Sequence, residues 1–128
     1  MKIHHLLVMA LVVSTLTACS RTAPVLNIQH PIQAQYSNDQ VRKAIIEAGL
    51  ARKWVMTPVA PGVINGHLYQ RGHSADIRID YTATSYKISY IGSQNLLASG
   101  GKIHRNYNRW VNNLDEDIKL RLSAQALN

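Results

Sequence analysis

The sequence predicts an α+β domain in which an antiparallel sheet of three to four strands packs against an N-terminal and a C-terminal helix as a two-layer sandwich. Two segments, residues 38–48 and 106–125, carry apolar residues at helical spacing. Between them, residues 53–91 hold short runs in which apolar and polar residues alternate, as in strands with one covered and one solvated face. The order helix, strands, helix is typical of an α+β fold rather than of alternating βα units.

The first 18 residues have the layout of a secretory signal. Lys2, His4 and His5 precede an apolar run, Leu6 to Val13, which small residues follow. This run is shorter than the roughly 20 residues that a membrane-spanning helix needs. We therefore expect residues 1–18 to form a signal peptide that is removed.

The segment Leu16-Thr17-Ala18-Cys19 contains the only cysteine of the chain and resembles the lipobox of bacterial lipoproteins. The resemblance implies cleavage after Ala18, a diacylglycerol on the Cys19 thiol, and a further acyl group such as palmitate on the new amino terminus. In such lipoproteins an Asp directly after the cysteine tends to retain the protein at the inner membrane. Here Ser20 follows the cysteine, so the resemblance implies an outer-membrane location. The alternative is a free or buried thiol, which an oxidising compartment disfavours. We expect a domain facing the periplasm and anchored by lipid.

Residues 19–36 are expected to form the lipidated cysteine and an extended tether, and residues 37–128 a single periplasmic domain. The tether contains Pro24 and Pro31 and has no helical period, with a short strand expected near Val25 to Ile28. At about 3.3 Å per residue, it would hold the domain a few tens of ångströms from the bilayer.

The expected mature chain is basic. The full chain has 14 Lys and Arg against 7 Asp and Glu, and removal of Lys2 leaves a net charge of +6. This charge favours anionic neighbours such as lipid head groups or peptidoglycan carboxylates. Nucleic acid is not an expected partner, because the signal directs the chain out of the cytoplasm. The basic residues are scattered from Arg21 to Arg121, so a solvated mixed surface is an equally good interpretation.

The first helix is expected from Asn38 to Ala48. Ser37 and Gln40 have the spacing of a capping box, and Gly49 offers a C-terminal stop. Four of its residues fall on one apolar face: Val41, Ala44, Ile45 and Ala48.

The strands are expected in four runs, at 53–60, 62–71, 74–82 and 85–91. The third run alternates most clearly and places four apolar side chains on one face, namely Ala75, Ile77, Ile79 and Tyr81. Short connections at 71–74 and 83–85 predict antiparallel hairpins.

The last element is an amphipathic helix over residues 106–125. Six residues form its apolar stripe: Tyr107, Trp110, Val111, Leu114, Ile118 and Leu122. We expect this stripe to cover the apolar face of the sheet, so that Tyr107 and Trp110 belong to the core rather than to a ligand platform.

Three short motifs follow an early Trp: Arg-x-His, Tyr-x-x-Ser-x-Asn-Leu and Ile-His-x-x-Tyr-Asn-x-Trp. The residues concerned are Trp54, Arg71, His73, Tyr90, Ser93, Asn95, Leu96, Ile103, His104, Tyr107, Asn108 and Trp110. In these residues the sequence is similar to a family of small, uncharacterised proteobacterial outer-membrane lipoproteins. The resemblance covers about residues 41–122 and implies a location and a fold, but no activity.

The candidate ligand-binding residues are Arg71, His73 and His104, which we expect to contact an anionic group if they share a pocket. An Arg can bind a carboxylate or phosphate bidentately, although a surface Arg paired with an Asp is an equal alternative. Ser93, Asn95 and Asn108 are expected to hydrogen-bond the backbone in turns and at helix starts.

Catalytic and metal sites are not predicted. A Ser-His-Asp catalytic triad could be chosen by residue type alone from Ser93, His104 and Asp80. Ser93, however, lacks the Gly-x-Ser-x-Gly context of a nucleophile elbow. Glu47 and Glu116, the only glutamates, lie on expected solvated helix faces, and residues 115–117 are interpreted as a solvated acidic turn. Four histidines of the mature chain, His30, His67, His73 and His104, lack the close spacing of zinc ligands. We expect no cofactor and no enzyme activity.

Two classes of function remain open. The leading expectation is a non-enzymatic outer-membrane lipoprotein whose domain is a binding or assembly module, with an envelope protein, an anionic envelope polymer or a second copy of the chain as partner. A sheet edge or the uncovered sheet face would mediate self-association. The alternative is a hydrolase or ligand-binding protein for an anionic envelope component such as peptidoglycan. A tether between the outer membrane and peptidoglycan is a third, weaker option.

Overall fold

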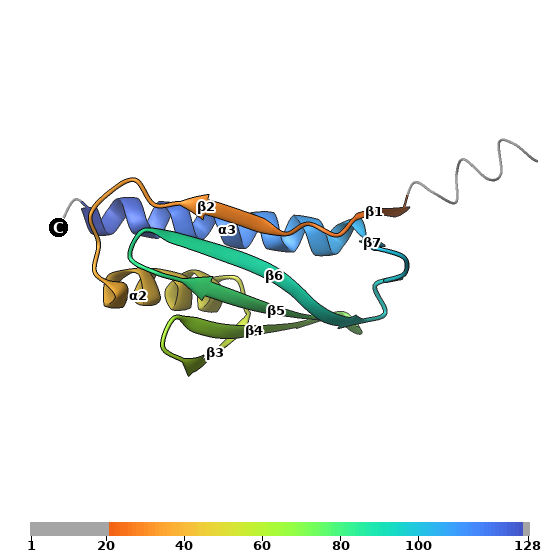
Figure 1. Ribbon diagram of the computed structural model, residues 1–128. Coiled ribbons are helices and arrows are strands. Elements are labelled where there is room, and N and C mark those ends of the chain that lie inside the picture. The colour runs from red at the N-terminus through yellow and green to blue at the C-terminus, as the bar shows by residue number, and fades with distance from the viewer. Residues whose placement is uncertain (1–20, 127–128) are drawn as a thin grey trace, which may run out of the picture.

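In the computed structural model, which describes residues 21–126, two helices cover one face of a five-stranded antiparallel sheet (Figure 1). The elements are β1 (Thr22–Pro24), β2 (Ile28–Pro31), α2 (Asn38–Ala51), β3 (Val55–Ala60), β4 (Val63–Gln70), β5 (His73–Tyr81), β6 (Ser85–Gln94), β7 (Lys102–His104) and α3 (Arg105–Ala126). The strand order of the main sheet is β2-β6-β5-β4-β3, while β1 and β7 form a separate two-stranded sheet. The α+β class is confirmed, but the expected three to four strands are too few.

The N-terminal segment packs into the domain, where the sequence predicted a tether. β2 pairs with β6 from Ile28 to Pro31, and β1 pairs with β7 so that Thr22 lies opposite His104. The Asn108 side chain of α3 fastens the link between these strands, since it donates to the Pro24 carbonyl at 3.0 Å and accepts from the Leu26 amide at 3.1 Å. The expected strand near Val25 to Ile28 overlaps β2 only at Ile28, because residues 25–27 form the link between β1 and β2.

Helix α2 begins as predicted and ends three residues later. The capping box is present, because the Ser37 hydroxyl accepts from the Gln40 amide and the Gln40 side chain accepts from the Ser37 amide. Gly49 does not stop the helix, since it is buried inside the last turn against Met56 of β3. A Cβ at Gly49 would clash with the Met56 side chain, so a larger residue there would require Met56 to move.

Lys53, not glycine, has the left-handed conformation that ends α2. Its φ is 67°, and the amides of Lys53 and Trp54 donate to the carbonyls of Leu50 and Gly49 at 3.1 and 2.9 Å. This is the hydrogen-bond pattern of a Schellman motif. This motif turns the chain sharply, so that the Trp54 side chain lies in the core.

Strands β3 to β6 form the expected antiparallel meander. The β4–β5 turn consists of Arg71 and Gly72, both with positive φ, as a two-residue type I′ hairpin requires. A bulge between Asp76 and Ile77 of β5 shifts the register with β6. Each edge strand of the main sheet contains a proline, Pro31 in β2 and Pro58 in β3, which removes a backbone donor from the exposed edge.

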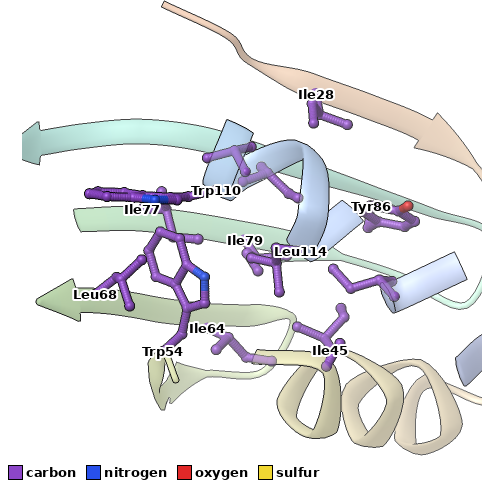
Figure 2. Close-up of a cluster of buried hydrophobic side chains, with 14 of the residues drawn as sticks. Ile28, Ile45, Trp54, Ile64, Leu68, Ile77, Ile79, Tyr86, Trp110 and Leu114 are labelled. Carbon is purple, nitrogen blue, oxygen red and sulfur yellow. The ribbon is translucent and has the colours of Figure 1, made fainter. Parts of the chain in front are cut away.

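Both helices lie on the same face of the sheet and share one core with it (Figure 2). All six residues of the predicted stripe on α3 are buried, together with Ile77, Ile79 and Ile88 of the central strands. The opposite sheet face is solvated and mixes charged with apolar side chains, among them His67, Asp76 and Arg78. Within residues 21–126, no helix is long and apolar enough to cross a membrane.

Candidate functional site

The three predicted ligand residues lie near one another in the fold but do not form a common pocket. Arg71 is exposed in the β4–β5 turn. The His73 Nδ1 lies 2.6 Å from the carbonyl oxygen of Asn95 and donates to it. The His104 Nδ1 accepts from the Asn106 amide at 3.1 Å and so caps the start of α3. Both imidazoles therefore hold backbone, and no hydrogen bond described for residues 21–126 joins the three side chains.

A chain of hydrogen bonds gathers these residues at the end of the domain where residues 21–24 enter. The Asn95 side chain donates to the Gly72 carbonyl at 2.9 Å, and the His104 amide donates to the Leu96 carbonyl at 2.7 Å. His104 in turn lies opposite Thr22 in the β1–β7 pair. Figure 1 shows β1, β7, the β4–β5 turn and the start of α3 at this one end.

Other residues of the three motifs also serve the architecture. The expectation that Asn95 and Asn108 bond the backbone is confirmed, and Asn95 has a positive φ of 58°. Ser93 differs, because its hydroxyl lies 2.7 Å from the Tyr90 hydroxyl. The Tyr90 ring packs edge-on against Tyr107 at 5.3 Å between ring centroids. The motifs thus describe how this end of the domain is held together.

A cleft of about 360 Å³ lies between the end of α2, β4 and the first half of α3. Its lining includes three basic residues and two indole rings, from Arg52, Lys53, Arg109, Trp54 and Trp110. Both tryptophans are largely buried, at 2% and 9% exposure, so little of either ring is accessible from the cleft. Figure 2 shows these two rings at the same end of the core, beside Leu68 of β4.

The charges of this cleft suit an anionic group, although one of them is already paired. Arg52 donates to Asp117 at 2.7 Å, which lowers the pKa of that carboxyl below its usual value and raises the pKa of Arg52. Lys53 and Arg109 form no ion pair within residues 21–126, and Arg109 donates to the Asn106 side chain at 2.9 Å. The residues described around the cleft include no carboxylate, imidazole, thiol or hydroxyl. The described lining therefore offers cationic and amide groups that can bind an anion.

A buried carboxylate in α3 corrects the interpretation of residues 115–117 as a solvated turn. Asp115 is only 4% exposed and lies within the helix. Its Oδ1 accepts from the Tyr86 hydroxyl at 2.6 Å, and its Oδ2 lies 3.1 Å from the His30 Nε2 and 3.2 Å from the Lys119 Nζ. This bond to Asp115 raises the pKa of Lys119. The cluster ties β2 and β6 to α3.

The Asp115 cluster borders a second cleft, of about 430 Å³. Its lining combines apolar residues with six polar ones, namely His30, Gln33, Tyr36, Tyr86, Lys119 and Ser123. Of these, His30, Tyr86 and Lys119 already bond the Asp115 carboxylate, and the Tyr36 hydroxyl donates to the Leu122 carbonyl. No local sequence pattern indicates this cluster, because His30 and Tyr86 are 85 and 29 residues away from Asp115. We assign it a structural role.

The triad considered from the sequence is not assembled. Ser93 bonds Tyr90, His104 caps α3, and Asp80 forms an ion pair with Arg78 at 3.0 Å. The two glutamates bond basic residues on the helices, Glu47 with Arg121 and Glu116 with Lys119. Within the described part of the chain, no three His, Cys, Asp or Glu side chains group as metal ligands.

The remaining predicted site residue, Cys19, lies outside the described residues. No protein-family model matches the chain, and no curated protein matches it.

Alkaline pH should destabilise the domain through its two buried tyrosines. Burial raises the pKa of Tyr107, and burial together with the bond to Asp115 raises the pKa of Tyr86. Below about pH 10 the two phenols are protonated in both the folded and the unfolded chain, so their contribution to the unfolding free energy is fully present. Above that pH, the phenols of the unfolded chain ionise readily while those of the folded chain stay protonated. We expect each tyrosine to remove about 1.4 kcal/mol of unfolding free energy per pH unit there. Urea unfolding at a series of pH values measures this loss.

Tyr107→Phe is the matched variant for this prediction. The Tyr107 hydroxyl is buried and bonds no other group within residues 21–126, so its removal should leave stability at neutral pH unchanged or raise it. The same change should make the alkaline loss shallower. An unchanged slope in Tyr107→Phe would contradict the prediction.

Proposed function

We propose that this protein is an outer-membrane lipoprotein, acylated at Cys19, whose periplasmic domain is a binding module without catalytic activity. The lipobox-like segment before Cys19 is the observation that carries the proposal. One acyl chain binds a bilayer only marginally, whereas two or three, at about 0.8 kcal/mol for each buried methylene, make attachment effectively permanent. The fold supports this placement because β1 begins three residues after Cys19, at one end of the domain.

Binding rather than catalysis is supported by the roles of the polar residues. The histidines and asparagines of the three motifs hold backbone segments in place, and the described lining of the basic cleft contains no carboxylate, imidazole, thiol or hydroxyl. Self-association through a sheet edge is less favoured, since each edge strand contains a proline, Pro31 at the end of β2 and Pro58 within β3.

Binding of an anionic envelope component in the cleft is the second candidate. The juxtaposition of Lys53 and Arg109 with the edges of Trp54 and Trp110 favours it. We rank it lower, because Arg52 is neutralised by Asp117 and the two rings are largely buried. Arg71, His73 and His104 do not line this cleft.

Acyl labelling tests the proposal directly. In cells fed an alkyne-tagged palmitate, the full chain should become labelled, fractionate with the outer membrane and have a mass that begins at Cys19. Cys19→Ala should remain unlabelled and keep residues 1–18. The matched control Ser20→Asp should stay labelled but move to the inner membrane, as the resemblance implies. Unlabelled wild-type protein, or protein that enters buffer without detergent, refutes the proposal.

A further inference from the structure

We infer that the end of the domain where residues 21–24 enter docks directly on anionic phospholipid head groups of the membrane that holds the anchor. Five exposed basic residues define this surface, called the basic end below: Arg21, Arg71, Lys102, Arg105 and Arg109. The inference rests on the proposed acylation of Cys19 for its orientation, but the surface itself follows from the fold.

The topology brings these five residues together from four separate segments. Arg21 precedes β1, Lys102 begins β7, and the β1–β7 pairing places Pro24 opposite Lys102. Arg105 begins α3 immediately after β7, and Arg109 follows one turn later. The bonds from Asn95 to Gly72 and His73 hold the Arg71 turn beside the loop that leads into β7. All of these elements meet at one end of the ribbon (Figure 1).

The charge of this end is unbalanced. The chain contains no Asp or Glu in residues 48–75 or 81–114, which supply Arg71, Lys102, Arg105 and Arg109. Elsewhere several basic residues of the helices and strands are paired, as in Arg52–Asp117, Arg78–Asp80 and Arg121–Glu47. Within residues 21–126, Arg71 and Lys102 form no ion pair. Their charges are available to an external anion.

The short connection to the anchor presses this end against the bilayer. Only Ser20 and Arg21 lie between Cys19 and Thr22, where β1 begins. Three residues span at most about 11 Å, in contrast to the few tens of ångströms expected for a free tether. A basic surface near an anionic leaflet is attracted within a Debye length, about 8 Å at physiological ionic strength. Both conditions are met only at this end of the domain.

Vesicle binding of the mature chain with Cys19→Ser tests the inference without the anchor. Residues 21–126 share one core, so this chain is expected to fold without its acyl groups. It should sediment with phosphatidylglycerol vesicles and not with phosphatidylcholine vesicles, and lose binding when salt rises from about 0.1 to about 1 M. Each basic residue near a surface contributes about fivefold to partitioning, so Arg71→Gln with Lys102→Gln should weaken binding roughly 25-fold.

A matched pair of substitutions separates this surface from net charge. Arg42→Gln with Lys87→Gln removes the same two charges from exposed positions in α2 and β6, away from the basic end, and should weaken binding only slightly. Equal weakening by both pairs, or no binding to phosphatidylglycerol, overturns the inference. Circular dichroism of each variant shows whether its fold is intact. If wild-type protein is acylated in cells but the docking fails, the proposed function stands and only this inference falls.

Discussion

Trp54→Ala is expected to lower the unfolding free energy by about 3 to 5 kcal/mol, the loss seen when a large aromatic side chain leaves a core. Trp54 is 2% exposed, and Figure 2 places its indole beside Leu68 of β4 and Trp110 of α3. The Schellman turn at Lys53 fixes the backbone just before it, so neighbouring side chains cannot readily fill the vacated volume. Urea denaturation followed by circular dichroism measures the loss.

Tyr69→Ala in β4 is the control for Trp54→Ala. Tyr69 is an aromatic residue on the solvated face of the sheet and is 70% exposed, so its loss should change stability by no more than about 0.5 kcal/mol. The loss of unfolding free energy in Trp54→Phe should lie between the losses in these two variants. This variant keeps the comparison possible if Trp54→Ala does not fold. A cost below about 1 kcal/mol for Trp54→Ala would show that the ring is a surface feature of the cleft rather than part of the core.

The parts of the fold that the sequence predicted well are those with regular local patterns. The stripe on α3 repeats every three or four residues for five turns, and all of its six residues are buried. The capping box at Ser37 and the alternation around Ile77 and Ile79 are equally local, and both are present. Each of these patterns contains enough residues to be distinguished from chance.

The short strands were missed because their pairing depends on distant residues. β1 and β7 have three residues each, too few for a period, and Thr22 meets a partner at His104. Pro24 and Pro31 favoured an irregular segment, although proline is tolerated in edge strands. What closes this part of the fold is the Asn108 side chain, 84 residues from Pro24.

The candidate site shows the same limit for side chains. Proximity of Arg71 and His73 was evident from a local turn, and the structure brings His104 to the same end of the domain. The partners of the two imidazoles, however, are backbone groups that only the folded chain presents. The cleft between α2 and α3 was not predicted either. Its cations come from the end of α2 and the start of α3, and its two indoles, from Trp54 and Trp110, are 56 residues apart in the sequence. Which polar side chains can contact a ligand is therefore determined by how distant segments assemble, and not by residue type alone.

The Asp115 cluster provides the second large effect, because it joins α3 to β2 and β6. Asp115→Ala should cost about 2 to 4 kcal/mol, since it leaves the buried Tyr86 hydroxyl without an acceptor and removes charged bonds to His30 and Lys119. Tyr86→Phe should cost about 1.5 to 3 kcal/mol through loss of one hydrogen bond to a charged group. The two effects are measured by urea unfolding at neutral pH.

The double variant decides whether Asp115 and Tyr86 act as one unit. If they do, it should cost little more than Asp115→Ala alone, with a coupling free energy of about 1 to 3 kcal/mol. Tyr107→Phe combined with Asp115→Ala is the control, because the two residues lie about 12 Å apart along α3 and their effects should add within about 0.5 kcal/mol. Additive effects of Tyr86→Phe and Asp115→Ala would mean that the 2.6 Å bond between them contributes no stability. The buried carboxylate would then hold β2 through His30 alone.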